Sequence, residues 1–368
     1  MKILFDGYYG YKNSGDDAFI EVSTWGSHTY WDSRENTFIG KSLPHTKHPY
    51  TGIRIKGKGL DRYYTYKEAL RSDYYISAGG STFNNHRLVS NRSFALAARI
   101  VNKKLKLGAI GVSIGPFKNK ENERSIIKYL QNLDFLSLRD QRSFDFASSF
   151  DLPYHPIKAF DLAALLPSVY SHSKSKDIIN DKDHRTIAIS ICNYERYVGG
   201  DLKKEASRNL FFKNLVELLA QNKRIHFKLF IFNGHKTMGD YEVSKELISR
   251  LNPSNLTIIP YLQDVKKTWN EIASCDFVLS TRMHASIFGC YAKIPFMLLE
   301  YHKKCTDFLE DVGQHSKYRI FDGDVDIKTI SDRIQSILFD DHVYQSPTRL
   351  EETIELAKRN FTDTIKLY

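Results

Sequence analysis

Short apolar segments alternate with longer amphipathic segments along most of the 368-residue chain. In the first half, β-branched and aromatic residues predict strands at 2–6, 73–78, 107–114 and 134–138. Helical patterns lie between and after them, at 15–24, 91–104, 122–132 and 140–149. Strands that alternate with helices in this way predict βαβ units and a parallel sheet.

The pattern is interrupted once and then resumes. Residues from about 168 to 185 are rich in Ser, Lys, Asp and His and show no apolar period, which is typical of a linker. Further strands are predicted at 186–191, 225–232, 256–259, 276–280 and 294–299, with helices at 203–222, 240–251, 265–274 and 283–292. Because the chain is longer than one hydrophobic core usually serves, we expect an α/β protein with two Rossmann-like domains, 1–168 and 185–345.

A last segment, 346–368, carries its own helical signal. Ser346 and Pro347 resemble a helix start, and the apolar residues Leu350, Ile354, Ala357, Phe361 and Ile365 recur every three or four positions. We expect this C-terminal helix to bury its stripe by packing back on the N-terminal domain. Pairing with another helix as a coiled coil is disfavoured, because the stripe is short.

Composition limits the compartment. No run of about 18 apolar residues is present, and the start of the chain turns polar too soon for a secretory signal. The four cysteines are far apart and lack zinc-ligand spacing, so we expect reduced, structural thiols and no metal site. These features predict a cytoplasmic protein.

The chain is basic, with a net charge of +10. Lysine and arginine are spread along its whole length, which disfavours a nucleic-acid groove. The charge favours anionic small molecules, or a peripheral contact with an anionic membrane surface that carries a lipid-linked substrate. A merely basic soluble protein is an equally good explanation.

Two glycine-containing turns follow predicted strands in the first half. One contains Asn13, Gly15, Asp16 and Asp17, and the other contains Gly79, Gly80, Ser81 and His86. Glycine lets a ligand approach the backbone, and these polar side chains suit sugar hydroxyls. A capped helix and an ordinary surface loop are the alternatives.

Cations follow three other predicted strands. Arg139 comes after 134–138, and Arg282 and His284 stand in one turn after 276–280, at the start of a predicted helix. Lys304 follows 294–299 in the same way. A guanidinium beside an imidazole at a helix start suits an anion bound next to a proton donor. A surface ion pair at Arg139 and a polar cap at His284 are the alternatives.

Taken in order, these motifs resemble the polysaccharide pyruvyl transferase family. The resemblance spans about 1–315 and rests on eight pieces: Tyr11-Lys-Asn-Ser-Gly15-Asp16-Asp17-Ala18, Gly79-Gly80-Ser81, Gly111-Val-Ser-Ile-Gly115-Pro116, Ser137-Leu-Arg139-Asp140, Asp161-Leu-Ala, Ser280-Thr-Arg282-Met-His284-Ala285, Ala292-Lys-Ile-Pro295 and Tyr301-x-x-Lys304. It implies a GT-B-like pair of domains with the site in the cleft between them.

The resemblance also implies roles for the residues. Phosphoenolpyruvate, a co-substrate, would be bound by Arg139 and Arg282, His284 would match the catalytic histidine, and Lys304 would add charge on the donor side. The acceptor, a glycan or a lipid-linked oligosaccharide, would lie against the N-terminal glycine turns, and no cofactor would be needed. The main rival is a nucleotide-sugar glycosyltransferase that uses Arg282 and Lys304 for the diphosphate. A non-enzymatic sugar-binding or scaffold protein is the third class, for which the 13% aromatic content would serve.

Overall fold

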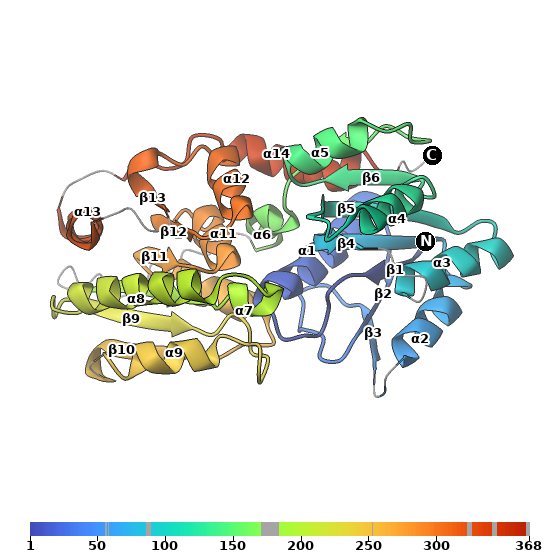
Figure 1. Ribbon diagram of the computed structural model, residues 1–368. Coiled ribbons are helices and arrows are strands. Elements are labelled where there is room, and N and C mark those ends of the chain that lie inside the picture. Colours follow the sequence, from blue (N-terminus) through green and yellow to red (C-terminus); the bar gives the residue numbers. More distant parts are fainter. Residues whose placement is uncertain are drawn as a thin grey trace. The chain divides into compact units, whose positions relative to one another are not determined.

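The computed structural model describes residues 1–55, 57, 59–85, 90–170, 184–251, 253–321, 326–340 and 344–365. The chain divides into two compact units (Figure 1). Unit 1 comprises Met1–Val169, Gln263–Val265 and Glu351–Tyr368, and unit 2 comprises Tyr170–Leu262 and Lys266–Leu350. Most of the expected linker, residues 171–183, lies outside the described residues.

Unit 1 contains a parallel sheet in the order β3-β2-β1-β4-β5-β6-β7. Its strands are β1 (Lys2–Asp6), β2 (Glu35–Gly40), β3 (Thr51–Arg54), β4 (Tyr74–Phe83), β5 (Lys106–Ile114), β6 (Phe135–Leu138) and β7 (Ile157–Lys158). The four predicted strands are confirmed as β1, β4, β5 and β6. The pattern missed three strands: β2, where polar residues interrupt the apolar signal, β3, which is largely exposed, and β7, which has two residues.

The helices of unit 1 lie on both faces of this sheet. A core of buried side chains packs one face against α2 (Leu60–Ala69), α3 (Asn91–Val101), α4 (Lys120–Leu130) and α5 (Gln141–Ser148). Helix α1 (Ser14–Trp31) is longer than the predicted 15–24, because it is buried on nearly all sides and so lacks an amphipathic period. A short turn, η1 (Leu162–Leu165), and α6 (Leu166–Val169) pack beside α1.

The C-terminal helix α14 (Leu350–Thr362) belongs to unit 1. The Trp31 Nε1–H donates to the Phe361 carbonyl at 2.8 Å, and the Asn360 amide donates to the Phe160 carbonyl at 2.9 Å. The predicted start at Ser346 and Pro347 is wrong. The amides of Thr348 and Arg349 instead donate to the carbonyls of Gly313 and Val312, so the helix begins at Leu350.

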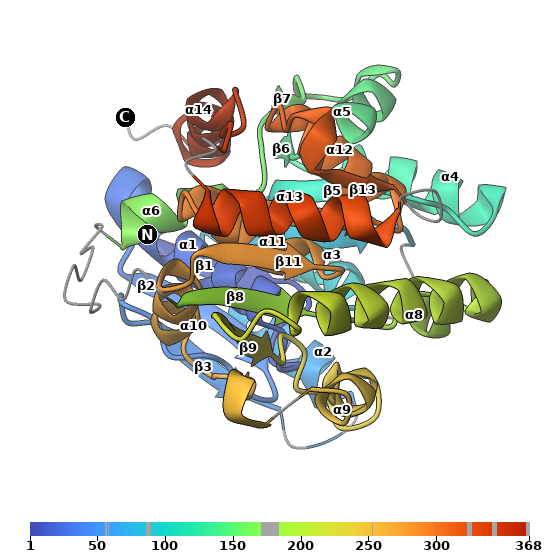
Figure 2. The same cartoon turned by 90° about the vertical axis from the view of Figure 1, so that its left-hand side faces the viewer.

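Unit 2 contains a second parallel sheet, in the order β10-β9-β8-β11-β12-β13. Its strands are β8 (Arg185–Ser190), β9 (Ile225–Phe230), β10 (Leu256–Ile259), β11 (Phe277–Ser280), β12 (Phe296–Glu300) and β13 (Arg319–Phe321). The helices α8 (Leu202–Leu219), α9 (Tyr241–Ile248) and α13 (Ile327–Phe339) contribute to the core on one face, where Figure 2 shows α8 and α13 over the sheet. The remaining helices are α7 (Glu195–Val198), α10 (Val265–Ala273), α11 (Met283–Tyr291) and α12 (Lys303–Asp311).

The two sheets share one topology. In each, the order of the strands reverses beside the first strand of the unit, between β1 and β4 in unit 1 and between β8 and β11 in unit 2. This is the order of a Rossmann-like sheet, and ligands of such sheets bind at the carboxyl ends of the strands where the order reverses. Two parallel α/β units confirm the predicted fold class, and the topology directs attention to the loops after these four strands.

Candidate functional site

Arg282 and His284 stand where the carboxyl end of β11 meets α11. Every residue of β11 is buried, so the chain can turn polar only where it leaves the sheet. The Ser280 hydroxyl donates to the Arg282 carbonyl at 3.1 Å and lies 2.8 Å from the Ser286 hydroxyl, which fixes this turn. Arg282 is the N-cap of α11 without a capping bond, and His284 lies in the first turn of the helix. Both side chains are mostly buried at a helix N-terminus, where anions are favoured.

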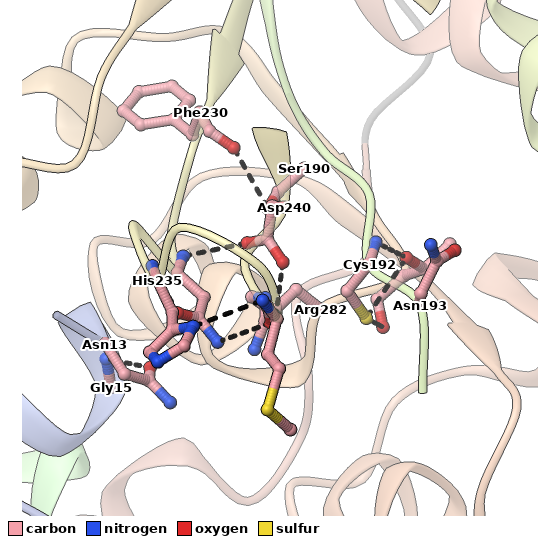
Figure 3. Close-up of polar contacts among 12 residues, drawn as sticks. Asn13, Gly15, Ser190, Cys192, Asn193, Phe230, His235, Asp240 and Arg282 are labelled. Atoms are coloured by element: carbon pink, nitrogen blue, oxygen red, sulfur yellow. Dashed lines mark hydrogen bonds and ion pairs between the residues drawn. The ribbon is translucent and has the colours of Figure 1, made fainter. Parts of the chain in front are cut away.

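The guanidinium of Arg282 is held by Asp240, which the sequence analysis did not select. The Arg282 Nη2 pairs with the Asp240 carboxylate, which is fully buried (Figure 3). Burial raises the pKa of Asp240, and the opposing effect of Arg282 is smaller. Burial acts to lower the pKa of Arg282, but the combined effects of Asp240, Cys192 and Tyr301 outweigh it and raise the pKa, so the guanidinium stays charged. Its Nε is buried and has no hydrogen-bond partner among the described residues, which is unusual for so strong a donor.

Asp240 is itself fixed by a compact loop after β9. Its other carboxylate oxygen accepts from the Asn233 amide at 2.8 Å, and its own amide donates to the Asn233 carbonyl at 2.8 Å. It occupies the N-cap position of α9, yet its side chain makes no capping bond. From sequence, an aspartate before a helix reads as a cap. The only distinguishing signal would have been a buried arginine in need of a partner 42 residues later.

Cys192 contacts Thr281, the residue that precedes Arg282. It follows β8, and its amide donates to the Thr281 hydroxyl at 2.9 Å. Burial raises the pKa of Cys192, and the positive charges of Arg282 and Lys304 both oppose this rise. Arg282 and Lys304 follow β11 and β12, which are neighbours in the sheet, so both stand at the same edge of it. The structure thus brings together Arg282, His284 and Lys304 at the carboxyl ends of β11 and β12.

Arg139 lies in unit 1 and is surrounded by hydrogen-bond acceptors. Its Nη1 donates to the Asp161 carboxylate at 2.5 Å, its Nε to the Ser113 hydroxyl at 2.7 Å, and its Nη2 to the Ser81 hydroxyl at 3.1 Å. The side chains of Arg139 and Asp161 are only 8% and 6% exposed. Arg139 therefore ties the carboxyl end of β4 to the ends of β5 and β6. Whether it also meets a donor stays a prediction.

The predicted turn at Gly79, Gly80 and Ser81 is wrong, because strand β4 continues through these residues to Phe83 with an irregular register. This part of β4 meets the first glycine turn of unit 1. Asn13 caps α1 by accepting from the Gly15 amide at 3.1 Å. Asp16 lies in the first turn of α1, and a Cβ added to Gly80 would come within 4.0 Å of its carboxylate. Gly79 and Gly80 both adopt positive φ, which favours glycine. A Cβ at Gly79 would also overlap the Phe19 ring.

The remaining acceptor predictions differ in their outcome. Asp17 is buried under the first turn of α1, so it is less accessible than Asp16. Ser81 faces Arg139, as described above. His86 lies outside the described residues. In the part of the chain that the structure describes, no group of three or more His, Cys, Asp or Glu side chains could hold a metal ion, and no helix is long and apolar enough to cross a membrane.

Solved structures share the fold at low sequence identity. UDP-GlcNAc 2-epimerase from Neisseria meningitidis, bound to UDP-GlcNAc, has a TM-score of 0.59 at 12% identity, covering 97% of this chain and 98% of that one. The α,α-trehalose 6-phosphate synthase of Burkholderia multivorans has a TM-score of 0.54 at 10% identity, covering 99% and 96%. Anabaena Alr3699/HepE, in complex with UDP and glucose, has a TM-score of 0.55 at 11% identity, covering 98% and 95%. These likenesses identify the GT-B fold.

Sequence comparison identifies the family. A search of curated proteins found no match. The family profile described as polysaccharide pyruvyl transferase, however, matches residues 15–303. That span begins inside the first glycine turn and ends beyond β12, so it includes the Arg139 cluster of unit 1 together with Asp240, Arg282 and His284 of unit 2. The chain belongs to the polysaccharide pyruvyl transferase family.

Proposed function

We propose that the protein transfers pyruvate from phosphoenolpyruvate to a pair of hydroxyls on a sugar, forming a cyclic ketal in a cell-surface polysaccharide. The observation that carries the proposal is the Arg282 guanidinium, anchored by Asp240 and left with a buried, unsatisfied Nε beside His284. An anion at this position would satisfy the Nε–H. Phosphoenolpyruvate has a carboxylate and a phosphate, with about three negative charges at neutral pH, so it needs several fixed cations.

The reaction needs one proton donor at the methylene carbon. In this proposal His284 protonates that carbon, the neighbouring carbon becomes electrophilic, and a sugar hydroxyl adds to it. The C–O bond to phosphate then breaks, and the second hydroxyl attacks the same carbon to close the ketal. One hydroxyl proton restores His284, and the other leaves with the phosphate. Arg282 and Lys304 stabilise the negative charge on the departing phosphate.

We assign the acceptor to the first glycine turn of unit 1 and to the carboxyl end of β4. Asn13, Asp16 and Ser81 offer short polar side chains beside Gly79 and Gly80, where no Cβ blocks the backbone. Carboxylates and amides of this kind suit sugar hydroxyls, as either a free glycan or a lipid-linked oligosaccharide would present them. We propose Arg139 as a further donor ligand, through N–H groups of the guanidinium that remain beyond its bonds to Asp161, Ser113 and Ser81.

A phosphate-release assay tests the proposal. Purified protein is incubated with phosphoenolpyruvate and with galactose-, glucose- or mannose-type acceptors, and the product is examined for a mass increase of one ketal-linked pyruvate. Arg282→Ala and His284→Ala should each abolish release. The matched controls are Arg250→Ala, which changes an exposed arginine just after α9, and His226→Ala, which changes a histidine at the start of β9. Neither control should reduce phosphate release. Full activity of both site variants would refute the assignment.

A nucleotide sugar is included in the same experiment, because one structural neighbour is described in complex with UDP and glucose. Thermal shifts are recorded with phosphoenolpyruvate, UDP-glucose and GDP-mannose. A rise in melting temperature with the nucleotide sugars and none with phosphoenolpyruvate would favour a glycosyltransferase in which Arg282 and Lys304 bind the diphosphate.

A further inference from the structure

The unexplained feature of unit 2 is a stack of aromatic rings and cations around Lys304. Tyr194 lies four residues beyond β8, at the N-cap of α7, and Lys304 lies in the first turn of α12 beyond β12. Strands β8 and β12 are the two neighbours of β11 in the sheet. The two residues therefore approach each other across the end of the strand that carries Arg282 and His284.

The Lys304 ammonium lies over the face of the Tyr194 ring. Its Nζ is 4.9 Å from the centroid of that ring and 5.9 Å from the centroid of the Tyr301 ring. A cation at these distances from a tyrosine face is attracted by the negative charge of the ring face. Tyr194 and Lys304 are both only partly buried.

The Tyr194 ring is in turn held in place. Its centroid is 5.0 Å from the Tyr301 ring and 5.0 Å from the His302 ring. Behind Tyr301, the Arg208 guanidinium lies 5.3 Å from the Tyr301 ring. Arg208 is nearly fully buried and also pairs with Glu195 at 3.6 Å. These contacts form a stack in the order Arg208, Tyr301, Tyr194 and Lys304. The stack holds in place the Tyr194 ring against which the Lys304 ammonium lies.

Such a support matters because lysine is flexible. A lysine side chain has four rotatable bonds, and binding an anion with it costs rotamer entropy unless the chain is already ordered. Lys304 and Arg282 follow the neighbouring parallel strands β12 and β11, so the ordered ammonium stands at the same edge of the sheet as the guanidinium. A ring under Lys304 would hold it in that place before the ligand arrives.

We propose that Tyr194 is a positioning residue, whose ring holds the Lys304 ammonium beside Arg282 to receive the phosphate of the anionic substrate. This inference rests on the proposed function for the identity of that substrate, but the positioning itself concerns any phosphate-bearing ligand of the site. The hydroxyl of Tyr194 has no part in it. The ring face alone carries the role.

The test measures binding and turnover in a set of variants of the full chain. Tyr194→Phe keeps the ring and should retain the wild-type dissociation constant for phosphoenolpyruvate. Tyr194→Leu removes the ring face and should raise the dissociation constant and the KM about fivefold, with kcat nearly unchanged. In a Lys304→Met background the same Tyr194→Leu change should have no further effect, since its partner is already absent. Equal circular dichroism spectra and melting temperatures confirm that each variant is folded.

UDP serves as a second probe, so that the two ideas can fail separately. If the wild type binds phosphoenolpyruvate and Tyr194→Leu binds it equally well, the positioning role is wrong and the proposed function stands. The proposed function is wrong and the positioning role stands if two results occur together. The wild type binds UDP but not phosphoenolpyruvate, and for UDP Tyr194→Phe keeps the wild-type dissociation constant while Tyr194→Leu raises it. A Tyr194→Phe variant as weak as Tyr194→Leu would assign the role to the hydroxyl and overturn the inference, and a wild type that binds neither anion overturns both.

Discussion

Neutralising Asp161 should destabilise unit 1 severely, because it leaves a buried charge without its partner. The change Asp161→Asn keeps the shape of the side chain and the oxygen that accepts from the Ala163 amide at 2.9 Å, but removes the negative charge opposite Arg139. Removing one member of a buried ion pair costs about 3–5 kcal/mol of unfolding free energy. For a domain of this size each kcal/mol lowers Tm by about 2–4 °C, so the expected fall is about 6–20 °C.

Differential scanning calorimetry and urea unfolding of the full chain measure this effect, with the transitions of the two units analysed separately. Glu355→Gln is the matched control, because it removes the carboxylate of an exposed pair in α14, where Glu355 lies 2.6 Å from Lys358. That change should cost at most about 0.5 kcal/mol. The double variant Arg139→Met with Asp161→Asn should recover part of the loss, since no unpaired charge remains. A Tm fall for Asp161→Asn no larger than that of Glu355→Gln would refute the reasoning.

Three further predictions follow from single contacts. Asp240→Asn removes the carboxylate that anchors Arg282, so it should lower kcat/KM for phosphoenolpyruvate by about 100-fold without unfolding the protein. An unchanged kcat/KM would show that the Arg282–Asp240 ion pair is not needed for activity. Gly26→Ala should destabilise unit 1 by about 1–3 kcal/mol in thermal unfolding, because the new Cβ would lie 2.2 Å from the Phe361 ring. The additional change Phe361→Leu in the same chain should restore part of the lost stability. Burial raises the pKa of all four cysteine thiols, to about 12 for two of them. Labelling of the thiols by a disulfide reagent at pH 8 should therefore be slow in the native protein and fast in urea. Rapid labelling of the native protein would contradict the burial.

The sequence predicted those elements whose burial is uniform. Strands such as β5 and β11 are buried along nearly all their length, so a continuous apolar run was sufficient to find them. Strand β3 packs mainly through backbone hydrogen bonds to β2 and has little apolar signal. The start of α14 was misplaced because its preceding amides bind carbonyls at the end of α12, a contact that no local pattern records.

The same division holds for the site. Arg282 and His284 could be found because they directly follow a predicted strand and precede a predicted helix. Their supports could not, because each lies far away in the chain. Asp240 reaches Arg282 from a loop that reads as a helix cap, and Tyr194 reaches Lys304 from a segment with no motif at all. Local patterns identify groups that could react, while tertiary contacts decide what holds them.

The position of α14 in unit 1 has a consequence for the growing polypeptide. Residues 170–350 are an insertion, in the sense that the chain leaves unit 1, builds the whole of unit 2 and then returns; within this span only Gln263–Val265 belong to unit 1. On the ribosome, Trp31 emerges early but must wait for Phe361, its packing and hydrogen-bonding partner, until translation is almost complete. Unit 2 can reach its final structure first, while Gly26 and Trp31 of α1 in the earlier-synthesised unit stay without the Phe361 ring that covers them in the finished protein.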